Sequence, residues 1–264
     1  MQIARIKLEN GATGWAARQG NGELLRIEGD PLFGQSTVTS VRVEAAQWLP
    51  PLEPRVIMCI GRNYAAHAAE GGAEPPEYPI LFMKNPQAAT GHLQPVRIPE
   101  VCVDEVDYEG ELAVVIKRHA LNVKRKEALD YVLGYCAAND ISARVWQEKK
   151  GGSQWCRGKG FDTFAPLGPV LVTADELPDP GNLNIRTTLN GQEVQNSNTS
   201  KMIFDVPALI EFLSQDTTLL PGTVILTGTP HGIGWARSPR LTLKPGDTVT
   251  VEVEKVGELR SPVE

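Results

Sequence analysis

The sequence lacks any excess of positive charge. Its 264 residues include 26 Lys and Arg against 32 Asp and Glu, a formal net charge of −6. A general nucleic-acid-binding protein needs a basic face, so this balance argues against that class. No apolar run approaches the ~20 residues that a membrane-spanning helix needs. We therefore expect no nucleic-acid or membrane partner, and a globular protein long enough to bury a substantial core.

Cysteine is also scarce. Cys59, Cys102, Cys136 and Cys156 lie far apart and form no C-x-x-C pair. Cys59 and Cys136 fall inside apolar runs, where an inert buried thiol is the usual outcome. The first residues show no signal-peptide core and no Arg- and Ser-rich presequence. We therefore expect a reducing compartment, the cytoplasm.

Glycine and proline divide the chain. Short alternating segments broken by glycines occupy residues 1 to about 48 and predict a small N-terminal β unit. The stiff Pro50-Pro51-Leu-Glu-Pro54 stretch then marks a boundary, so we expect units at 1–50 and 51–264. Strands dominate the second unit, and its helices are few and short. The sequence therefore predicts a β-rich α+β fold.

A few segments of the second unit have specific local signals. Asn190-Gly191 between two alternating runs predicts a hairpin. Amphipathic periodicity predicts helices over 125–135 and 204–213, the latter with Pro207 in its first turn. Residues 140–147 are compatible with a helix, which would place Gln147 on the same face as Asp140.

The stretch from Glu105 to Asp140 is unusually acidic beside apolar strands. Glu109 and Glu111 are two residues apart at the start of an apolar run, so on a strand they share a face. Two neighbouring carboxylates in a partly dry place are costly to ionise, and a hard divalent cation removes that cost. Oxygen-only ligands suit magnesium, calcium or manganese rather than zinc. Asp140, after another apolar segment, could complete the shell; the alternative is a solvated acidic strand end.

A histidine and a glutamate lie one helical turn apart. Ala65 to Glu70 is a short helix by propensity, and in it His67 and Glu70 are neighbours at i and i+3. A carboxylate beside an imidazole orients it and raises its basicity, as a general base requires. The alternative is a surface salt bridge. Because glycines follow, this helix could act as a lid.

Lys159 lies between two glycines in a polar stretch, and aromatic residues follow it. The glycines allow close backbone approach to a ligand, so Lys159 is a candidate anion-binding or catalytic lysine, with a basic surface loop as the alternative. Lys84 could be a site lysine or a strand-end charge. Residues 227–234, rich in glycine and threonine, form an oxygen-binding turn without the spacing of a P-loop.

These segments, in this order, resemble the fumarylacetoacetate hydrolase superfamily over about residues 52 to 264. The likeness is tightest to the fumarylacetoacetate hydrolase domain-containing proteins and to hydroxyhepta-dienedioate isomerases. The matching motifs are Gly61-Arg-Asn-Tyr-Ala-Ala-His67, Asp107-Tyr-Glu-Gly-Glu-Leu-Ala, Asn139-Asp140-Ile-Ser-Ala-Arg144, Arg157-Gly-Lys159-Gly-Phe-Asp-Thr163-Phe and Thr227-Gly-Thr-Pro-His-Gly-Ile-Gly234.

The resemblance implies a mixed β-roll, a homodimer, and one magnesium or manganese ion per subunit. By motif match, the metal ligands would be Glu109, Glu111 and Asp140. Lys159 would be the site lysine, and His67 with Glu70 the dyad on a lid.

The resemblance also implies substrate contacts. By motif match these would come from Arg62, Gln147, Thr163 and Thr229. Gly160 departs from the family pattern, because many relatives have serine after the lysine, so no hydroxyl contact is available there.

The implied chemistry begins with an enolate. A small 2-oxo or acylpyruvate-type acid would chelate the cation, and the cation with Lys159 nearby would stabilise the enolate as charge builds up. We place C–C cleavage, by hydrolysis or decarboxylation, ahead of tautomerisation or isomerisation, because a pure tautomerase need not activate water with His67 and Glu70. The alternatives are an oxaloacetate tautomerase or hydroxyhepta-dienedioate-type isomerase, and, from another class, a catalytically silent metal- or ligand-binding homologue.

Overall fold

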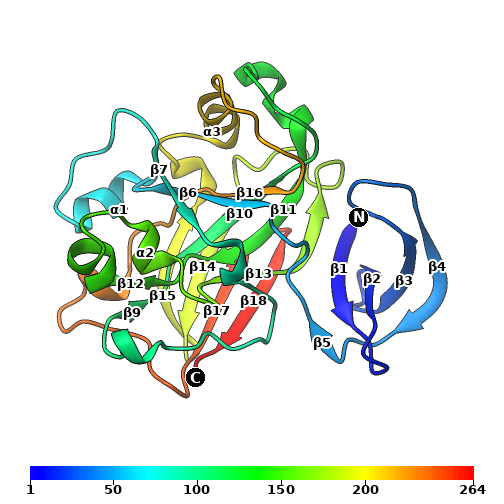
Figure 1. Ribbon diagram of the computed structural model, residues 1–264, viewed down its shortest axis with the longest axis horizontal. Helices are drawn as coiled ribbons and strands as arrows, with labels where there is room; N and C mark the ends of the chain where they lie inside the picture. The colour runs from blue at the N-terminus through cyan, green and yellow to red at the C-terminus, as the bar shows by residue number, and fades with distance from the viewer.

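The computed structural model describes residues 1–264, and strands dominate it (Figure 1). The largest sheet has twelve strands. Its main path runs in the order β4 (Ser36–Val43), β3 (Leu24–Gly29), β2 (Thr13–Arg18), β1 (Gln2–Lys7), β13 (Ala165–Thr173), β11 (Val132–Asn139), β10 (Gly110–Ile116), β16 (Thr223–Leu226), β6 (Val56–Gly61) and β7 (Ile80–Lys84). Two short strands join it off this path, β5 (Gln47–Trp48) on β1 and β8 (Ala89–Thr90) on β13.

A second sheet packs against the middle of the first. Its order is β15 (Gln192–Asn198), β14 (Asn184–Leu189), β17 (Thr248–Val253) and β18 (Gly257–Pro262). β17 packs on β10 and β11, and β18 packs on β11 and β13. Every residue of β10 and β11 is buried, because neighbouring strands flank both and the second sheet covers them. These two strands therefore end in a dry interior.

Helices are few and short. They are α1 (Ala65–Glu70), α2 (Cys156–Lys159) and α3 (Val206–Leu213), with brief 3₁₀ turns and one π-helical turn, η4 (Trp146–Lys150). The predicted β-rich α+β fold is confirmed. A two-stranded ladder of β9 (Val106–Asp107) and β12 (Ser142–Ala143) closes one end beside α2. None of the helices has the length and apolar character needed to cross a membrane.

The N-terminal strands stand to one side of the rest of the chain (Figure 1). β1 to β4 pair as an antiparallel meander, and β1 also pairs with β13 through Gln2↔Val172 and Ile3↔Leu171. The N-terminal strands are therefore hydrogen-bonded into the same sheet as strands of the predicted second unit. The boundary near residue 50 stays a prediction.

Local sequence patterns predicted the tight hairpin turn correctly, but they predicted a helix where the chain instead pairs with distant strands. Asn190 and Gly191 have φ of 54° and 80°, as a two-residue hairpin turn requires, and they join β14 to β15. The helix predicted over 125–135 is wrong: a 3₁₀ helix, η3 (Arg125–Tyr131), ends where β11 begins. Val132 and Leu133 belong to β11, a strand paired on both sides, and this outweighs their helical periodicity.

The segment after Asp140 also differs from expectation. Residues 140–147 are not one helix, because Ser142 and Ala143 pair with β9 before the π-helical turn begins at Trp146. Lys159 lies at the end of α2 and not in a loop, and its side chain is only 2% exposed. The chain therefore folds back so that Lys159 approaches the ends of β10 and β11.

Candidate active site

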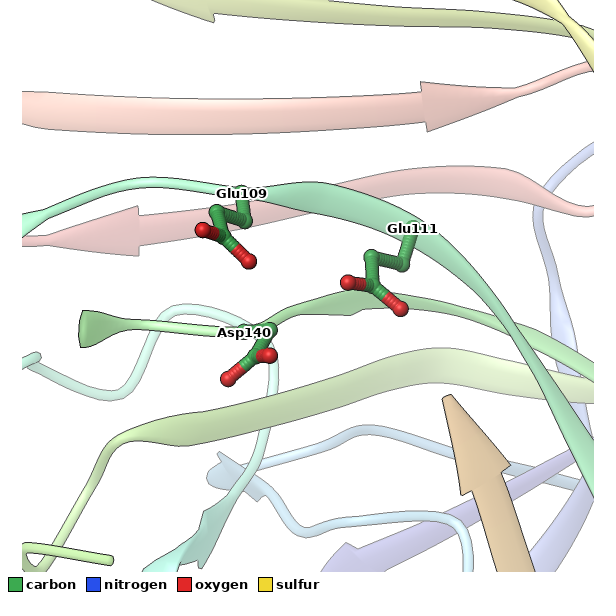
Figure 2. Close-up of side chains that lie close together, drawn as sticks. All are labelled: Glu109, Glu111 and Asp140. Carbon is green, nitrogen blue, oxygen red and sulfur yellow. The ribbon is translucent and has the colours of Figure 1, made fainter. Parts of the chain in front are cut away.

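Three carboxylates meet where β10 begins and β11 ends. The antiparallel register pairs Gly110 with Asn139, so Glu109 and Asp140 flank the same rung of the ladder. The backbone N–H of Asp140 donates to the carbonyl of Glu109 at 2.8 Å. One oxygen from each of Glu109, Glu111 and Asp140 lies within 4.8 Å of the others, and all three residues are buried. Figure 2 shows the two glutamates projecting from one side of their strand toward Asp140.

Three cations surround this cluster. Lys159 Nζ lies 3.0 Å from Glu109 and 2.7 Å from Asp140, and it donates to Ser142 Oγ at 2.8 Å. On the other side of Asp140, Lys84 Nζ lies 2.6 Å from Oδ1. An arginine, Arg144, lies 2.6 Å from Glu109 Oε1. The cluster is therefore a network of opposite charges with little exposed surface.

Burial and charge act differently on the two glutamates. Burial raises the pKa of Glu109, but Lys159 and Arg144 outweigh it and hold that pKa well below its usual range. Burial raises the pKa of Glu111, and the neighbouring Asp140 and Glu109 raise it further. Of the two glutamates, Glu111 is therefore the one whose ionisation is unfavourable in the metal-free protein.

The cluster fits a hard divalent cation. Its donors are all carboxylate oxygens, as magnesium, manganese and calcium prefer. Oδ1 of Asp140 is buried and lies 2.6 Å from Lys84 Nζ. Oε2 of Glu111 accepts from the Gly228 N–H at 2.6 Å, which orients this carboxylate. Three converging buried carboxylates, one of them with a raised pKa, are features that a divalent cation would satisfy.

His67 and Glu70 form a second constellation on α1. His67 Nδ1 lies 2.7 Å from Glu70 Oε1, so the two side chains are paired as their spacing predicts. The other carboxylate oxygen of Glu70 accepts from the Gly232 N–H at 2.8 Å. This bond ties α1 to the turn after β16. Because Glu70 occupies Nδ1, the Nε2 atom of His67 is the one left for proton transfer.

A pocket of about 290 Å³ joins the two constellations. His67, Glu70, Glu109 and Lys159 line it, and Glu111 and Asp140 are not among its lining residues. The predicted substrate contacts Arg62, Gln147 and Thr229 also line it, and the apolar part of the wall comes from Ile60, Phe82, Trp155, Ile233, Trp235 and Ala236.

Thr163 is placed elsewhere. Its hydroxyl accepts from the Arg97 N–H at 2.9 Å, its φ is 67°, and it does not line the pocket. The structure therefore does not bring Thr163 to the other predicted substrate contacts; it gives the residue a role in fixing a turn.

Thr229 and Gln147 are held by neighbours. The Thr229 hydroxyl donates to the Gly110 carbonyl at 3.0 Å and accepts from the Gln195 amide at 2.8 Å. Gln147 accepts from Arg144 at 3.0 Å. Both side chains therefore have fixed orientations at the pocket wall.

Two charged residues of the site had no role assigned from the sequence. Arg144 donates to Asp107 through two nitrogens at 2.8 and 3.0 Å, and it also contacts Glu109. Lys84, for which the sequence left two options open, is completely buried and donates to the carbonyls of Ile141 and Lys159. The available signal was position alone: Lys84 ends a strand, and Arg144 lies four residues after Asp140. Their carboxylate partners are far away in the sequence.

Comparison with known proteins assigns the chain to a family. A model of the fumarylacetoacetate (FAA) hydrolase C-terminal family matches residues 56–264. The chain belongs to the fumarylacetoacetate hydrolase family. The superfamily resemblance predicted from the motifs is thereby confirmed.

Named relatives and solved structures extend the match. The chain is 50% identical over 214 residues to the Xenopus laevis protein named oxaloacetate tautomerase fahd2, mitochondrial, covering 81% of this chain and 67% of that one. Identity to the human protein named oxaloacetate tautomerase FAHD2A, mitochondrial, is 43% over 222 residues, covering 84% and 70%. The crystal structure of a 5-carboxymethyl-2-hydroxymuconate delta-isomerase from Mycobacterium smegmatis aligns with a TM-score of 0.85 and 38% identity, over 100% of this chain and 99% of that one. These matches confirm the expected fold and an enzyme of this family.

Proposed function

We propose that the protein is a divalent-metal-dependent enzyme that interconverts the keto and enol forms of a small 2-oxo acid, with oxaloacetate as the first candidate. The observation that carries the proposal is one pocket lined both by Glu109 and Lys159, at the edge of the buried carboxylate cluster, and by the His67–Glu70 pair. The relatives named oxaloacetate tautomerases, up to 50% identical, support the choice of substrate. Two isomerases among the solved relatives support the reaction type.

The roles follow from the contacts. Glu109, Glu111 and Asp140 would hold the ion, magnesium first and manganese or calcium as alternatives. When bound, such an ion supplies Lewis acidity toward a 2-oxo group. Lys159, between Glu109 and Asp140, neutralises excess negative charge and offers a positive charge to the developing enolate.

His67 is the proton carrier in this proposal. Its Nε2 removes a proton from the methylene carbon beside the 2-oxo group, and the proton returns to the oxygen to give the enol, so no atom is lost. Glu70 holds the other nitrogen and stabilises the imidazolium that forms. The Gly232 N–H donates to Glu70 and fixes its carboxylate, so the His67–Glu70 pair keeps its position at the pocket wall.

Cleavage of a C–C bond is the second candidate. It is favoured by the same His67–Glu70 pair, which can activate a water, and by a solved relative named fumarylacetoacetate hydrolase from Exiguobacterium antarcticum, at 30% identity and a TM-score of 0.85. The two outcomes share the enolate and differ in whether a proton or a carbon group leaves. Tautomerisation stands first because the named relatives of highest identity given above are tautomerases.

One assay separates these outcomes. Oxaloacetate is supplied with magnesium, the ultraviolet absorbance of its enol is followed, and products are read by NMR, with buffer and metal alone as the control. Faster enol–keto exchange without pyruvate supports the tautomerase, and pyruvate formation supports cleavage. A protein without effect on either reaction would be the catalytically silent homologue. His67→Asn should abolish whichever activity is seen and leave metal binding intact.

The assembly and compartment are further parts of the proposal. A homodimer is supported by the open edge of the main sheet, where β7 exposes Leu81 and Met83, 44% and 42% accessible. Light scattering of the eluted protein tests it. Four free thiols favour a reducing compartment such as the cytoplasm, although several relatives carry the word mitochondrial in their names.

A further inference from the structure

Two arginines, a lysine and a histidine line the pocket, and one of these four side chains has no partner. Three are paired with carboxylates: His67 with Glu70, Arg144 with Asp107 and Glu109, and Lys159 with Glu109 and Asp140. The fourth, Arg62, has no carboxylate within 4.0 Å and donates no side-chain hydrogen bond to the protein. Glu148 also lines the pocket, and no ion pair joins it to Arg62. An unpaired guanidinium facing a pocket is available to an anionic ligand.

The backbone holds Arg62 in an unfavourable conformation. Its φ is 54°, in the left-handed region that costs a residue with a side chain roughly 1–2 kcal/mol. The next residue, Asn63, anchors the turn: its amide donates to the carbonyls of Phe204 and Thr227 and accepts from the Phe204 N–H. These hydrogen bonds of Asn63 fix the turn between β6 and α1, and so they hold the adjacent Arg62 in its strained conformation.

An indole supports the guanidinium. Arg62 Cζ lies 5.6 Å from the ring centroid of Trp155, over its face. Gly61 packs so closely on the same ring that a Cβ there would lie 2.2 Å from it. Stacking on an aromatic face leaves the N–H edge of a guanidinium free, and that edge matches a carboxylate in two-point geometry. Arg62 is thus oriented for a planar anion.

We propose that Arg62 receives the second carboxylate of the substrate and so restricts the enzyme to dicarboxylic 2-oxo acids. The inference rests on the proposed function, in which the 2-oxo acid end faces the carboxylate cluster. The cations near that cluster are already neutralised, so a distal carboxylate has Arg62 as its unpaired partner. The pocket, at about 290 Å³, lies at the small end of the ~300–1,000 Å³ range of ligand sites and suits a short diacid.

The test compares two substrates that differ only at the distal end. Oxaloacetate and its 4-methyl monoester share the 2-oxo acid and the enolisable methylene, and the ester lacks the distal charge. Arg62→Met keeps the length of the stem and removes the charge. Arg157→Met is the matched control, because Arg157 also stacks on aromatic rings, Trp146 and Phe161, but lies outside the pocket. Binding isotherms with magnesium accompany the kinetics.

Arg62→Met should raise KM for oxaloacetate by about 10- to 100-fold, the size of a lost hydrogen bond to a charged group. It should leave kcat for oxaloacetate and both constants for the monoester near wild type, because the contact is equal in ground and transition states. Arg62→Lys should recover part of the loss, and Arg157→Met should change nothing. An equal loss on both substrates, or no loss, would overturn the assignment.

The binding data separate this proposal from the proposed function. If wild type binds oxaloacetate without turnover, the reaction is wrong, and the affinity of Arg62→Met still decides the role of Arg62. If wild type prefers the monoester, the assignment of Arg62 fails even when turnover is present.

Discussion

Replacing Glu111 by glutamine should stabilise the metal-free protein at neutral pH. Burial, Asp140 and Glu109 raise the pKa of this carboxyl above its ordinary 4.5. The native state therefore holds the proton more tightly than the unfolded chain, and stability falls as pH rises above 4.5 toward the raised value. Glutamine has no charge to lose, and its side-chain oxygen can still accept from the Gly228 N–H.

The gain in stability from Glu111→Gln has an upper limit. One pH unit is worth about 1.4 kcal/mol, so the interval from pH 4.5 to pH 7 allows at most about 3 kcal/mol in the free energy of unfolding. At roughly 2–4 °C per kcal/mol for a chain of about this size, the melting temperature should rise by at most about 6–12 °C. Below pH 4.5 the gain should vanish, because wild type is then protonated in both states.

Thermal unfolding in chelator, from pH 4 to pH 8, measures this effect. Glu44→Gln, at an exposed carboxylate without an ion pair, is the control and should change nothing. Added magnesium should stabilise wild type and have little effect on Glu111→Gln, since that variant loses a ligand. A loss of stability at pH 7 in chelator, or an equal gain at pH 4, would refute the reasoning.

Three further predictions follow from the contacts of the site. Glu70→Gln should lower kcat by about 10²–10⁴-fold, the usual share of general acid–base catalysis, with unchanged magnesium affinity by calorimetry. Asn63→Ala should lower the free energy of unfolding by about 2–4 kcal/mol in urea, because three backbone groups, one buried and two part-buried, lose their partner. Chelation should abolish activity, and magnesium or manganese should restore it where zinc does not; full activity in chelator would contradict a role for the carboxylate cluster.

Much of the site could be predicted because its parts follow local periodicities. Glu109 and Glu111 share a face since a strand has a period of two, and His67 meets Glu70 since a helix brings i and i+3 together. The structure brings these four residues to one region with Asp140 and Lys159, and their roles stay predictions. Glycine and asparagine likewise signalled the β14–β15 hairpin, because few residues tolerate a positive φ at both turn positions.

Periodicity failed where another strand competed for the same residues. Residues 125–135 have a helical pattern, yet Val132 and Leu133 enter β11, because β10 and β13 offer hydrogen bonds on both edges. Thr163 lies apart from the other predicted contacts: its φ is 67°, its hydroxyl accepts from the Arg97 N–H, and its substrate contact stays a prediction.

The sequence by itself determined the β-rich fold class, the acidic strand, the histidine pair and the family, since each depends on residues close together in the chain. Only the tertiary structure decided which charges neutralise one another. Lys159 reaches carboxylates 19 and 50 residues away, and Lys84 pairs with Asp140 from 56 positions earlier in the chain. Arg62 is left unpaired for the same reason, because the choice of partner in a dry interior is made by distance in space.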